Sequence, residues 1–386
     1  MKYIKDLQAL EDFCKEIKQD RFITFDTEFI REKTYKPELC LIQIAGEKSS
    51  ALIDVLEFFD LKPLIDILID KKIMKVCHSG QQDLEIFYEN YQIIPAPLAD
   101  TQIMAMCNGY GENVAYHVLV SAICKTKLNK EMQLTNWKKR PLSEQQKKYA
   151  IADVTYLRDI YEVLLEKLKE KGRESWIEEE VSKLIDEDKY RFNIEDGWRK
   201  IKIKRHNPKQ LSVVRALTFW REVEAYQQNK NRARILSDEA IYEISITQPQ
   251  DKSQLFDLRK SNIRQVQKYT DQILNLVKQA LKSPVSEMPK VPKKQIITEA
   301  NQSLIDLLKL LLKLISGQYG VASKLIANAK EIENFVLFQN KDHATEFMKG
   351  WRYDIYGKLA QKIIEGELFL GYSDGKIIFR LNSSEI

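Results

Sequence analysis

Apolar residues in the first part of the chain gather into short runs that are typical of β-strands. Four such runs cover residues 22–29 (FITFDTEF), 39–45 (LCLIQIA), 50–56 (SALIDVL) and 73–78 (IMKVCH). They are rich in β-branched and aromatic side chains, and turn-forming or helical stretches separate them. A short helix is predicted from Pro63 and a second helix over residues 82–91. This alternation of strands and helices indicates an α/β domain.

Beyond Thr101 the apolar spacing in this domain is helical, with no further strand signal. Residues 112–124 predict one helix, and a long helix is predicted from Ser143 to about Lys171. Its first turn reads Ser-Glu-Gln-Gln, which fits a capping box in which Gln146 reaches back to the first residue. We therefore expect the α/β domain to occupy residues 1–195.

The rest of the chain predicts two small helical domains. Residues 208–283 and 298–386 have helical periodicity and similar sizes but no strict repeat. A proline-containing linker, residues 284–297, is expected between them. The final stretch, LFLGYSDGKIIF, favours a short hairpin that turns at Asp374-Gly375.

Composition and charge narrow the class of protein only moderately. Of the 386 residues, 44% are hydrophobic and 30% are charged, as in ordinary soluble globular domains. The net charge of +5 is a weak indication of nucleic-acid binding, but the charges are unevenly placed. Residues 198–210 (WRKIKIKRHNPKQ) contain six Lys or Arg and no acid, and a second basic stretch ends at Lys294. Such runs can neutralise phosphates, although a solvated linker explains each run equally well.

Cysteine usage and the N-terminus bear on the compartment. The five cysteines, an odd number with no CxxC pair, argue against a disulfide framework and are compatible with reducing conditions. The N-terminal segment has no apolar signal core. The most apolar helix, residues 304–315, is interrupted by charges and is too short to span a bilayer. We expect a cytoplasmic protein that does not enter a membrane.

The first chemical signal is a pair of carboxylates on one strand. Asp26 and Glu28 lie two residues apart in the first run, so their side chains project from the same face of the predicted strand. Like charges this close are unfavourable unless a cation offsets them, and carboxylate oxygens suit Mg²⁺ or Mn²⁺ better than zinc. Short D-x-E patterns are common, however, so a strand with one solvent-exposed face is the simpler explanation of this pair alone.

Two further positions extend this signal. Asp83 starts the helix after the fourth strand, where α/β folds place ligands, although an acid in a first helical turn is also explained by the helix macrodipole. Tyr149 and Asp153 lie one turn apart on the long helix and share a face, as an ordinary surface pair would. When each position is considered alone, a structural role explains Asp83 or the Tyr149 and Asp153 pair better than a catalytic role does.

Together, the four acids and the tyrosine match the requirements of a two-metal phosphodiesterase site. In such a site two divalent ions about 3.5–4 Å apart hold the attacking water and the leaving 3′ oxygen of an in-line displacement. Carboxylates bridge and hold the ions. A tyrosine hydroxyl orients the water more than it deprotonates it at neutral pH, because its free pKa is about 10.

The motifs FDTEF, HSGQQD and YAIADVTYL resemble the tyrosine subgroup of the DEDD superfamily of 3′→5′ exonucleases. The stretches KPELCLIQIA, ADTQIMA and TNWKKRPLSEQQKKYAIADVTYL are similar to the ribonuclease D family and extend the resemblance to about residue 175. The resemblance implies a ribonuclease H-like α/β exonuclease domain that trims the 3′ ends of tRNA precursors and other small structured RNAs and releases nucleoside 5′-monophosphates. It also implies that Tyr149 orients the attacking water, and that two Mg²⁺ or Mn²⁺ ions are held by Asp26, Glu28, Asp83 and Asp153.

The helical part extends the resemblance. ALTFWREVEAYQQNKNRARILSDEAIYEI is similar to an HRDC domain, although Asn231-Arg232 stands where the family often has Pro-Arg. Residues 348–368 are more weakly similar to the second helical domain of ribonuclease D. Two all-α HRDC-type domains are thus implied, which would hold RNA and form a ring or funnel with the catalytic domain. Trp220, Arg221 and Tyr226 are weaker candidate contacts, because aromatic residues at helical spacing usually pack inward. The candidate RNA-binding residues are Thr27, His78, Arg140, Lys202, Lys204, Arg205, Arg232 and Arg234.

Other chemistries lack support in the sequence. The four histidines are scattered, and none pairs with a cysteine at zinc spacing. No P-loop motif or nucleophile elbow is present, so we expect a protein that uses no ATP. We also expect a monomer. Two alternatives stay open. A DNA-directed 3′→5′ exonuclease would be distinguished by rates on matched RNA and DNA oligonucleotides, and a catalytically silent RNA-binding scaffold is disfavoured by the complete acid set.

Overall fold

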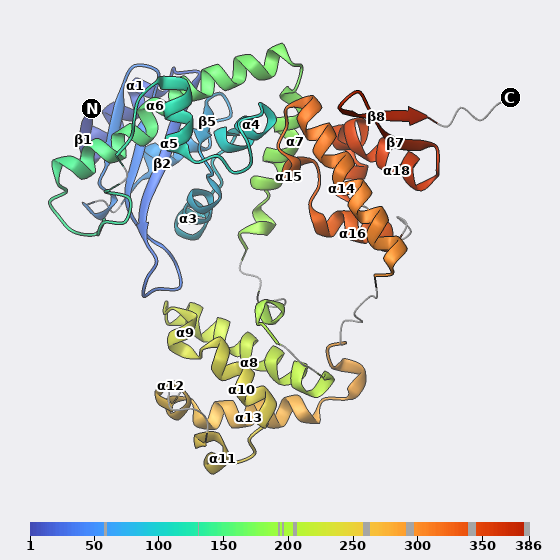
Figure 1. The fold of residues 1–386 in the computed structure, drawn as a ribbon. Coiled ribbons are helices and arrows are strands. Elements are labelled where there is room, and N and C mark those ends of the chain that lie inside the picture. Colours follow the sequence, from blue (N-terminus) through green and yellow to red (C-terminus); the bar gives the residue numbers. More distant parts are fainter. Residues whose placement is uncertain are drawn as a thin grey trace.

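The computed structural model describes residues 1–57, 60–129, 131–191, 194, 197–203, 207–257, 263–290, 297–338 and 345–381. In these residues the chain forms a mixed sheet with helices on both faces, followed by two helical modules (Figure 1). We call residues 208–282 the middle module and residues 299–381 the C-terminal module. Among the helices of the described residues, none has both the length and the apolar character needed to cross a membrane.

Six strands form the sheet of the first domain, in the spatial order β1-β4-β3-β2-β5-β6. β3 is antiparallel to both of its neighbours, β2 and β4, whereas β1 runs parallel to β4. On the other side of β2, β5 and β6 continue the sheet in parallel. β2 is therefore an interior strand with partners on both sides. The strands are β1 (Lys2–Ile4), β2 (Phe22–Ile30), β3 (Glu38–Ala45), β4 (Ser50–Ile53), β5 (Met74–Cys77) and β6 (Leu98–Asp100).

Alternate residues of β2 face two different helical layers. Ile23 and Phe25 are fully buried in a core formed with α1 (Leu7–Ile17), α2 (Lys62–Leu68) and α3 (Gln81–Tyr91). On the opposite face, the hydroxyl of Thr24 donates a 2.8 Å hydrogen bond to the carbonyl of Val154 in α6 (Glu144–Glu170). Asp26 and Glu28 share the face of Thr24, so the fold directs both carboxylates toward α6.

The capping box predicted at Ser143 is confirmed. Ser143 Oγ accepts a 3.1 Å hydrogen bond from the backbone N–H of Gln146, and Gln146 Oε1 accepts one of 3.0 Å from the N–H of Ser143. α6 then runs for 27 residues across the sheet. A fixed start determines which side chains of a helix face the sheet, and Tyr149 and Asp153 depend on it.

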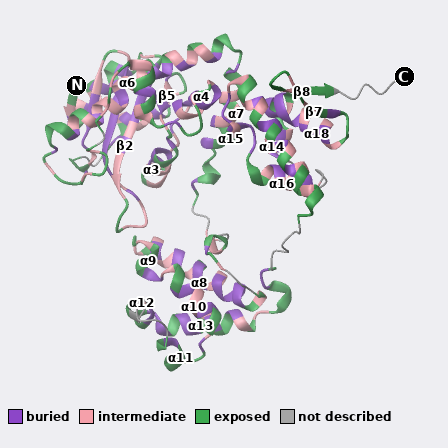
Figure 2. Cartoon of the chain, viewed as in Figure 1, coloured by how far each residue is buried: buried purple, intermediate pink, exposed green. Residues whose placement is uncertain are grey.

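The middle module has its own hydrophobic core, separate from that of the sheet domain (Figure 2). Its first three helices have 20, 4 and 10 residues, and the first three of the C-terminal module have 21, 4 and 10. The two modules thus begin with the same order of elements. The middle module contains α8 (Pro208–Gln227), α9 (Arg232–Ile235), α10 (Asp238–Thr247), α11 (Lys252–Phe256), α12 (Ile263–Lys268) and α13 (Thr270–Lys282). The C-terminal module contains α14 (Glu299–Tyr319), α15 (Ser323–Ile326), α16 (Ala329–Phe338), α17 (Gly350–Arg352) and α18 (Lys358–Ile364).

The C-terminal module shares a continuous core with the sheet domain. Buried residues of α4 (Thr101–Cys107) and α6 belong to the same apolar cluster as those of α14 and α16. The rings of Trp176, in α7 (Glu174–Leu184), and Trp351 stack with centroids 4.2 Å apart. Arg173 donates across the same junction to the carbonyl of Tyr319 at 2.6 Å. These two parts therefore form one packed body.

The structure corrects several boundaries. The strand predicted over residues 50–56 ends at Ile53 and is followed by a 3₁₀ turn, Val55–Glu57. The helix predicted over residues 112–124 begins only with α5 (Tyr116–Leu119) and continues as a π-helical turn. The sequence reading does not include α1, β1 or β6. The C-terminal hairpin is confirmed as β7 (Leu368–Ser373) and β8 (Lys376–Leu381), so the last domain is not purely helical.

Candidate active site

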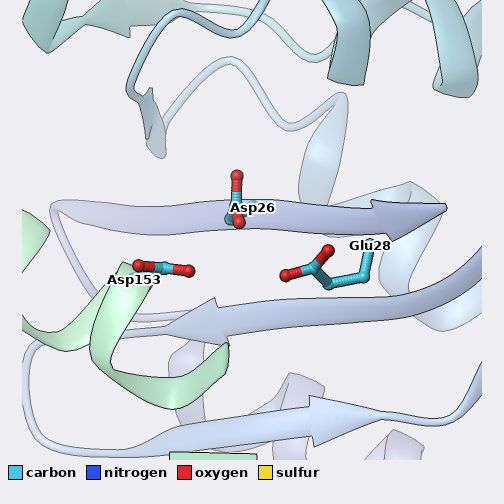
Figure 3. Close-up of side chains that lie close together, drawn as sticks. All are labelled: Asp26, Glu28 and Asp153. Atoms are coloured by element: carbon cyan, nitrogen blue, oxygen red, sulfur yellow. The ribbon is translucent and has the colours of Figure 1, made fainter. Parts of the chain in front are cut away.

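Three carboxylates converge between β2 and α6. Asp26 and Glu28 extend from β2, and Asp153 approaches from α6 (Figure 3). One oxygen from each side chain lies within 4.8 Å of the other two. The strand spacing and the helix phase inferred from the sequence thus bring these acids to one point.

The fourth acid, Asp83, reaches the same cavity from α3 on the other side of β2. The hydroxyl of Thr27, which points away from α6, donates to the Asp83 carboxylate. Asp83 is buried and the charge of Asp26 contributes to raising its pKa, although Asp83 does not belong to the group of three acids. Thr27 therefore holds the fourth acid in place beside the other three.

Burial raises the pKa of every acid in the cluster, and neighbouring carboxylates add to the shift at Asp26, Glu28 and Asp83. Burial is the larger cause of the pKa of about 8 at Asp26, and the charge of Asp153 adds to it. Burial, then Asp26, Asp153 and Asp83, raise the pKa of Glu28 to about 10. Burial raises the pKa of Asp153 to about 7 and that of Asp83 well above its ordinary value. Without a compensating charge, the cluster retains protons at neutral pH.

Tyr149 lies next to Asp153, one helical turn earlier on α6. Its ring centroid is 6.1 Å from that of the buried Trp137, which holds the phenol against the cavity wall. Burial, followed by the charges of Asp153 and Glu28, raises the pKa of Tyr149 above its ordinary value. The hydroxyl is therefore a neutral donor and acceptor at neutral pH, suited to orienting a water molecule.

The donor set fits divalent cations. All four acids offer carboxylate oxygens, the ligands that Mg²⁺ and Mn²⁺ prefer. None of the ion pairs found among the described residues involves Asp26, Glu28, Asp83 or Asp153. A part-buried group of acids with no positive partner in that part of the chain is stabilised when a cation enters.

The acids line a cavity of about 1350 Å³. This volume exceeds the ~300–1,000 Å³ of a typical small-molecule pocket and suits the end of a polymer. Residues 31–34 after β2 and residues 128–129 and 133–139 before α6 contribute to the lining. Lys33, Lys138 and Lys139 are exposed lining residues from these two segments. Their ammonium groups place positive charge on the rim around an acidic centre, and that of Lys138 pairs with Glu38 of the same lining at 2.9 Å.

The predicted RNA-binding residues are scattered over the structure. Thr27 and His78 line the cavity, and the imidazole of His78 contacts Thr101 Oγ1 at 3.0 Å and the Val114 carbonyl at 3.1 Å. Lys202 and Arg234 are exposed and do not line the cavity, and Lys204 and Arg205 lie outside the described residues.

Two of the predicted contacts are engaged with other protein groups. Arg140 is absent from the cavity lining, because its guanidinium binds Asp54 and donates to the carbonyl oxygens of Trp137 and Cys40. Arg232 lies 5.5 Å from the ring centroid of Tyr35 and pairs with Glu222 at 3.5 Å. The geometry gives both side chains structural contacts.

Sequence reasoning missed the three lysines of the rim. Lys138 and Lys139 occur in the stretch TNWKKRPL, whose resemblance to ribonuclease D drew attention away from its charge. The signal was available, because two adjacent lysines precede the arginine and proline that lead into the catalytic helix.

Comparison with known proteins adds to this geometry. Residues 1–169 match a family model described as a 3′-5′ exonuclease, and residues 210–277 match the HRDC domain. The curated protein Ribonuclease D of Bartonella henselae is 38% identical over 98% of this chain and 93% of its own length. Ribonuclease D of Zymomonas mobilis is 38% identical over 99% of this chain and 98% of its own length. The chain belongs to the ribonuclease D family. The chain is accordingly a 3′→5′ exoribonuclease, a hydrolase that acts on RNA, and the silent-scaffold alternative is set aside.

Solved structures agree with the arrangement of all three parts. Escherichia coli RNase D, described as an exoribonuclease involved in structured RNA processing, superposes with a TM-score of 0.83 at 26% identity. The match covers 95% of this chain and 98% of that one. A protein from Bifidobacterium adolescentis has a TM-score of 0.72 at 20% identity and shares the fold. The expected fold class, an exonuclease domain followed by helical domains, is confirmed.

Proposed function

We propose that this exoribonuclease removes 3′ extensions from tRNA precursors and other small structured RNAs, one nucleotide at a time. The products would be nucleoside 5′-monophosphates. The observation that carries the proposal is the part-buried acid cluster inside a large cavity whose rim bears exposed lysines. An acidic centre requires cations to accept a phosphodiester, and cationic walls attract the RNA backbone.

Within this proposal the four acids and Tyr149 have distinct roles. Asp26, Glu28, Asp83 and Asp153 hold two divalent ions, Mg²⁺ or Mn²⁺. When bound, such ions stabilise the charge on the attacking and leaving oxygens. The raised pKa of Tyr149 keeps its hydroxyl protonated, so the hydroxyl orients the attacking water by hydrogen bonding.

The cavity walls supply a reason for trimming to stop at a folded stem. The site lies between two chain segments, the one after β2 and the one before α6. An unpaired 3′ end enters between them, whereas a paired stem is wider than one strand. RNA selectivity over DNA would come from contacts to the 2′-hydroxyl.

We propose domain boundaries at residues 1–195 for the exonuclease domain, 208–283 and 298–386 for the helical domains, and 284–297 for the linker. The two helical domains would hold the body of the RNA while its 3′ end lies in the cavity. We further propose that the protein acts in the cytoplasm as a monomer and without ATP.

The test is a cleavage assay on a 5′-labelled tRNA with a short 3′ extension, in Mg²⁺, in EDTA, and with Asp26→Asn beside the natural protein. We expect a ladder that shortens from the 3′ end, stops near the acceptor stem, and is absent in EDTA and in the variant. RNA binding by Asp26→Asn should persist. Cleavage by Asp26→Asn at the normal rate would rule out the proposed site, and equal rates on matched RNA and DNA oligonucleotides would favour a general 3′→5′ exonuclease.

A further inference from the structure

The side chain of Gln43, in β3, is fully buried beside the acid cluster. Neither its Oε1 nor its Nε2 has a hydrogen-bond partner among the residues that the structure describes. Buried polar atoms almost always have partners in folded proteins, so an amide with two unpartnered atoms points to a missing interaction.

The sheet register gives the position of this amide. Gln43 is the direct cross-strand partner of Asp26 in the antiparallel pair of β2 and β3. Residues paired in this way project from the same face, with Cβ atoms roughly 4.5–5.5 Å apart. Leu41 and Leu52 of the neighbouring positions pack with Ala150 of α6 in one apolar cluster. Gln43 therefore lies in an apolar layer beneath α6, on the side where Asp26 and Asp153 meet.

We propose that Gln43 is a positioning residue of the cation site, an inference that rests on the function proposed above. In the cation-loaded protein, its amide N–H donates to the carboxylate oxygen of Asp26 that does not face the cation. A hydrogen bond to Asp26 supplies a partner that the buried amide lacks among the described residues. It fixes the orientation of Asp26, which a strand backbone alone does not determine.

The competing explanation is that the unpartnered amide is a tolerated packing defect. The two explanations predict different cation affinities for Gln43→Met. Methionine has nearly the same length and no polar atoms, so both explanations predict a metal-free protein at least as stable as the natural one. Only a positioning role predicts weaker cation binding. Thr218→Val is the matched control, because Thr218 is also fully buried with an unpartnered hydroxyl among the described residues, but in the middle module.

The experiment is a titration of RNA-free protein with Mn²⁺, following free Mn²⁺ by electron paramagnetic resonance, together with the thermal shift that Mn²⁺ produces. We expect Gln43→Met to bind Mn²⁺ about 10–100-fold more weakly and to show a smaller thermal shift, as is usual for residues that support a metal ligand. Thr218→Val should match the natural protein. Equal Mn²⁺ affinity in Gln43→Met would overturn the role of Gln43.

Two additional measurements keep the outcomes separable. If the natural protein and Asp26→Asn bind Mn²⁺ equally, the proposed cation site itself fails, whatever Gln43 does. If Gln43→Met does not fold, the side-chain amide of Gln43 is followed by NMR in natural protein and assigned from through-bond correlations to its backbone in ¹³C,¹⁵N-labelled protein. Mg²⁺ should then shift this resonance in the natural protein and not in Asp26→Asn, and an unshifted resonance would also overturn the proposal.

Discussion

The hydroxyl of Tyr35 donates a 3.0 Å hydrogen bond to Oε2 of Glu222, although the two residues are 187 positions apart. Tyr35 lies in the connection between β2 and β3, and Glu222 lies in α8 of the middle module. Beside them, the Lys36 N–H donates to Asn229 Oδ1, and the Asn231 N–H donates to the Lys33 carbonyl, both at 3.0 Å. The connection that docks the middle module thus also carries Lys33 to the cavity.

We predict that loosening this contact impairs the enzyme on structured RNA. Tyr35→Phe combined with Asn229→Ala removes two hydrogen bonds, each worth about 1 kcal/mol. The radius of gyration from small-angle X-ray scattering should rise, and kcat/KM on a tRNA precursor should fall about 3–10-fold while cleavage of a short single strand is unchanged. Tyr372→Phe, on the exposed C-terminal hairpin, is the control. An unchanged radius of gyration would show that other contacts hold the module.

Tyr149→Phe tests the role of the hydroxyl in the chemical step. We expect kcat to fall about 100–1,000-fold, the range for a lost proton-transfer or orienting group, with KM and Mn²⁺ affinity nearly unchanged. Tyr156→Phe removes a hydroxyl from the same helix at a position that does not line the cavity and should have little effect. A variant that loses Mn²⁺ binding instead would make Tyr149 part of the cation site.

The raised pKa values of the acids predict how the metal-free protein responds to pH. The folded-state values, about 8 for Asp26 and about 10 for Glu28, exceed the value of ~4 for an unfolded carboxyl group. Between those limits the folded protein binds more protons than the unfolded chain, so its stability falls as pH rises. In EDTA, the free energy of unfolding from urea titrations should be lower at pH 8 than at pH 5.5.

Glu28→Gln provides the matching variant. It removes the most strongly perturbed acid and should stabilise the EDTA-treated protein at pH 8 by about 1–3 kcal/mol, with a smaller gain at pH 5.5. Mg²⁺ should raise the melting temperature of the natural protein more at pH 8 than at pH 6, because protons compete with the cation. An equal gain from Glu28→Gln at both pH values would mean that the cluster is not protonated as described.

The lysine rim predicts a salt-dependent effect on binding. In an Asp26→Asn background, which prevents cleavage, Lys33→Ala or Lys139→Ala should each weaken binding of single-stranded RNA. Each should also reduce the slope of log affinity against log salt by about 0.7, the value for one lost phosphate contact. Lys252→Ala, in α11 and paired with Asp271, should leave the slope unchanged. A uniform slope in all three variants would place the RNA backbone elsewhere.

The separate cores predict two unfolding transitions. The C-terminal module shares its core with the sheet domain, whereas the middle module has its own. Trp351→Ala should destabilise the shared body by about 3–5 kcal/mol, and Trp220→Ala should lower only the transition of the middle module. Differential scanning calorimetry would show this, and a single transition shifted by both variants would contradict it.

Long, strongly patterned elements were predictable from the sequence and very short ones were not. α6 has a capping box and 27 residues of helical spacing, so the sequence predicts its start and end within about a turn. β1 and β6 have three residues each and depend on their neighbours in the sheet, β4 and β5, for pairing. Tertiary pairing of this kind leaves almost no periodic signal in the chain.

The candidate site was likewise only partly predictable from the sequence. Asp26 and Glu28 share a strand, and Tyr149 and Asp153 share a helix, so local spacing predicts that the members of each pair lie side by side. The meeting of the two pairs with Asp83 depends on the packing of α6 and α3 around β2, which only the resemblance supplied. Gln43 gave no signal, because its significance comes from the cross-strand register with Asp26.

The capped start of α6 has a consequence for how this chain tolerates insertions and deletions. Ser143 fixes the first turn, and each residue of a helix advances the side-chain direction by about 100°. One residue inserted between Ser143 and Tyr149 would rotate both Tyr149 and Asp153 out of the cavity while leaving the helix intact. The chain just before Ser143 is held in a different way, because Trp137 packs against Tyr149 and Arg140 pairs with Asp54. A change of length is therefore excluded from the cap through the next three turns.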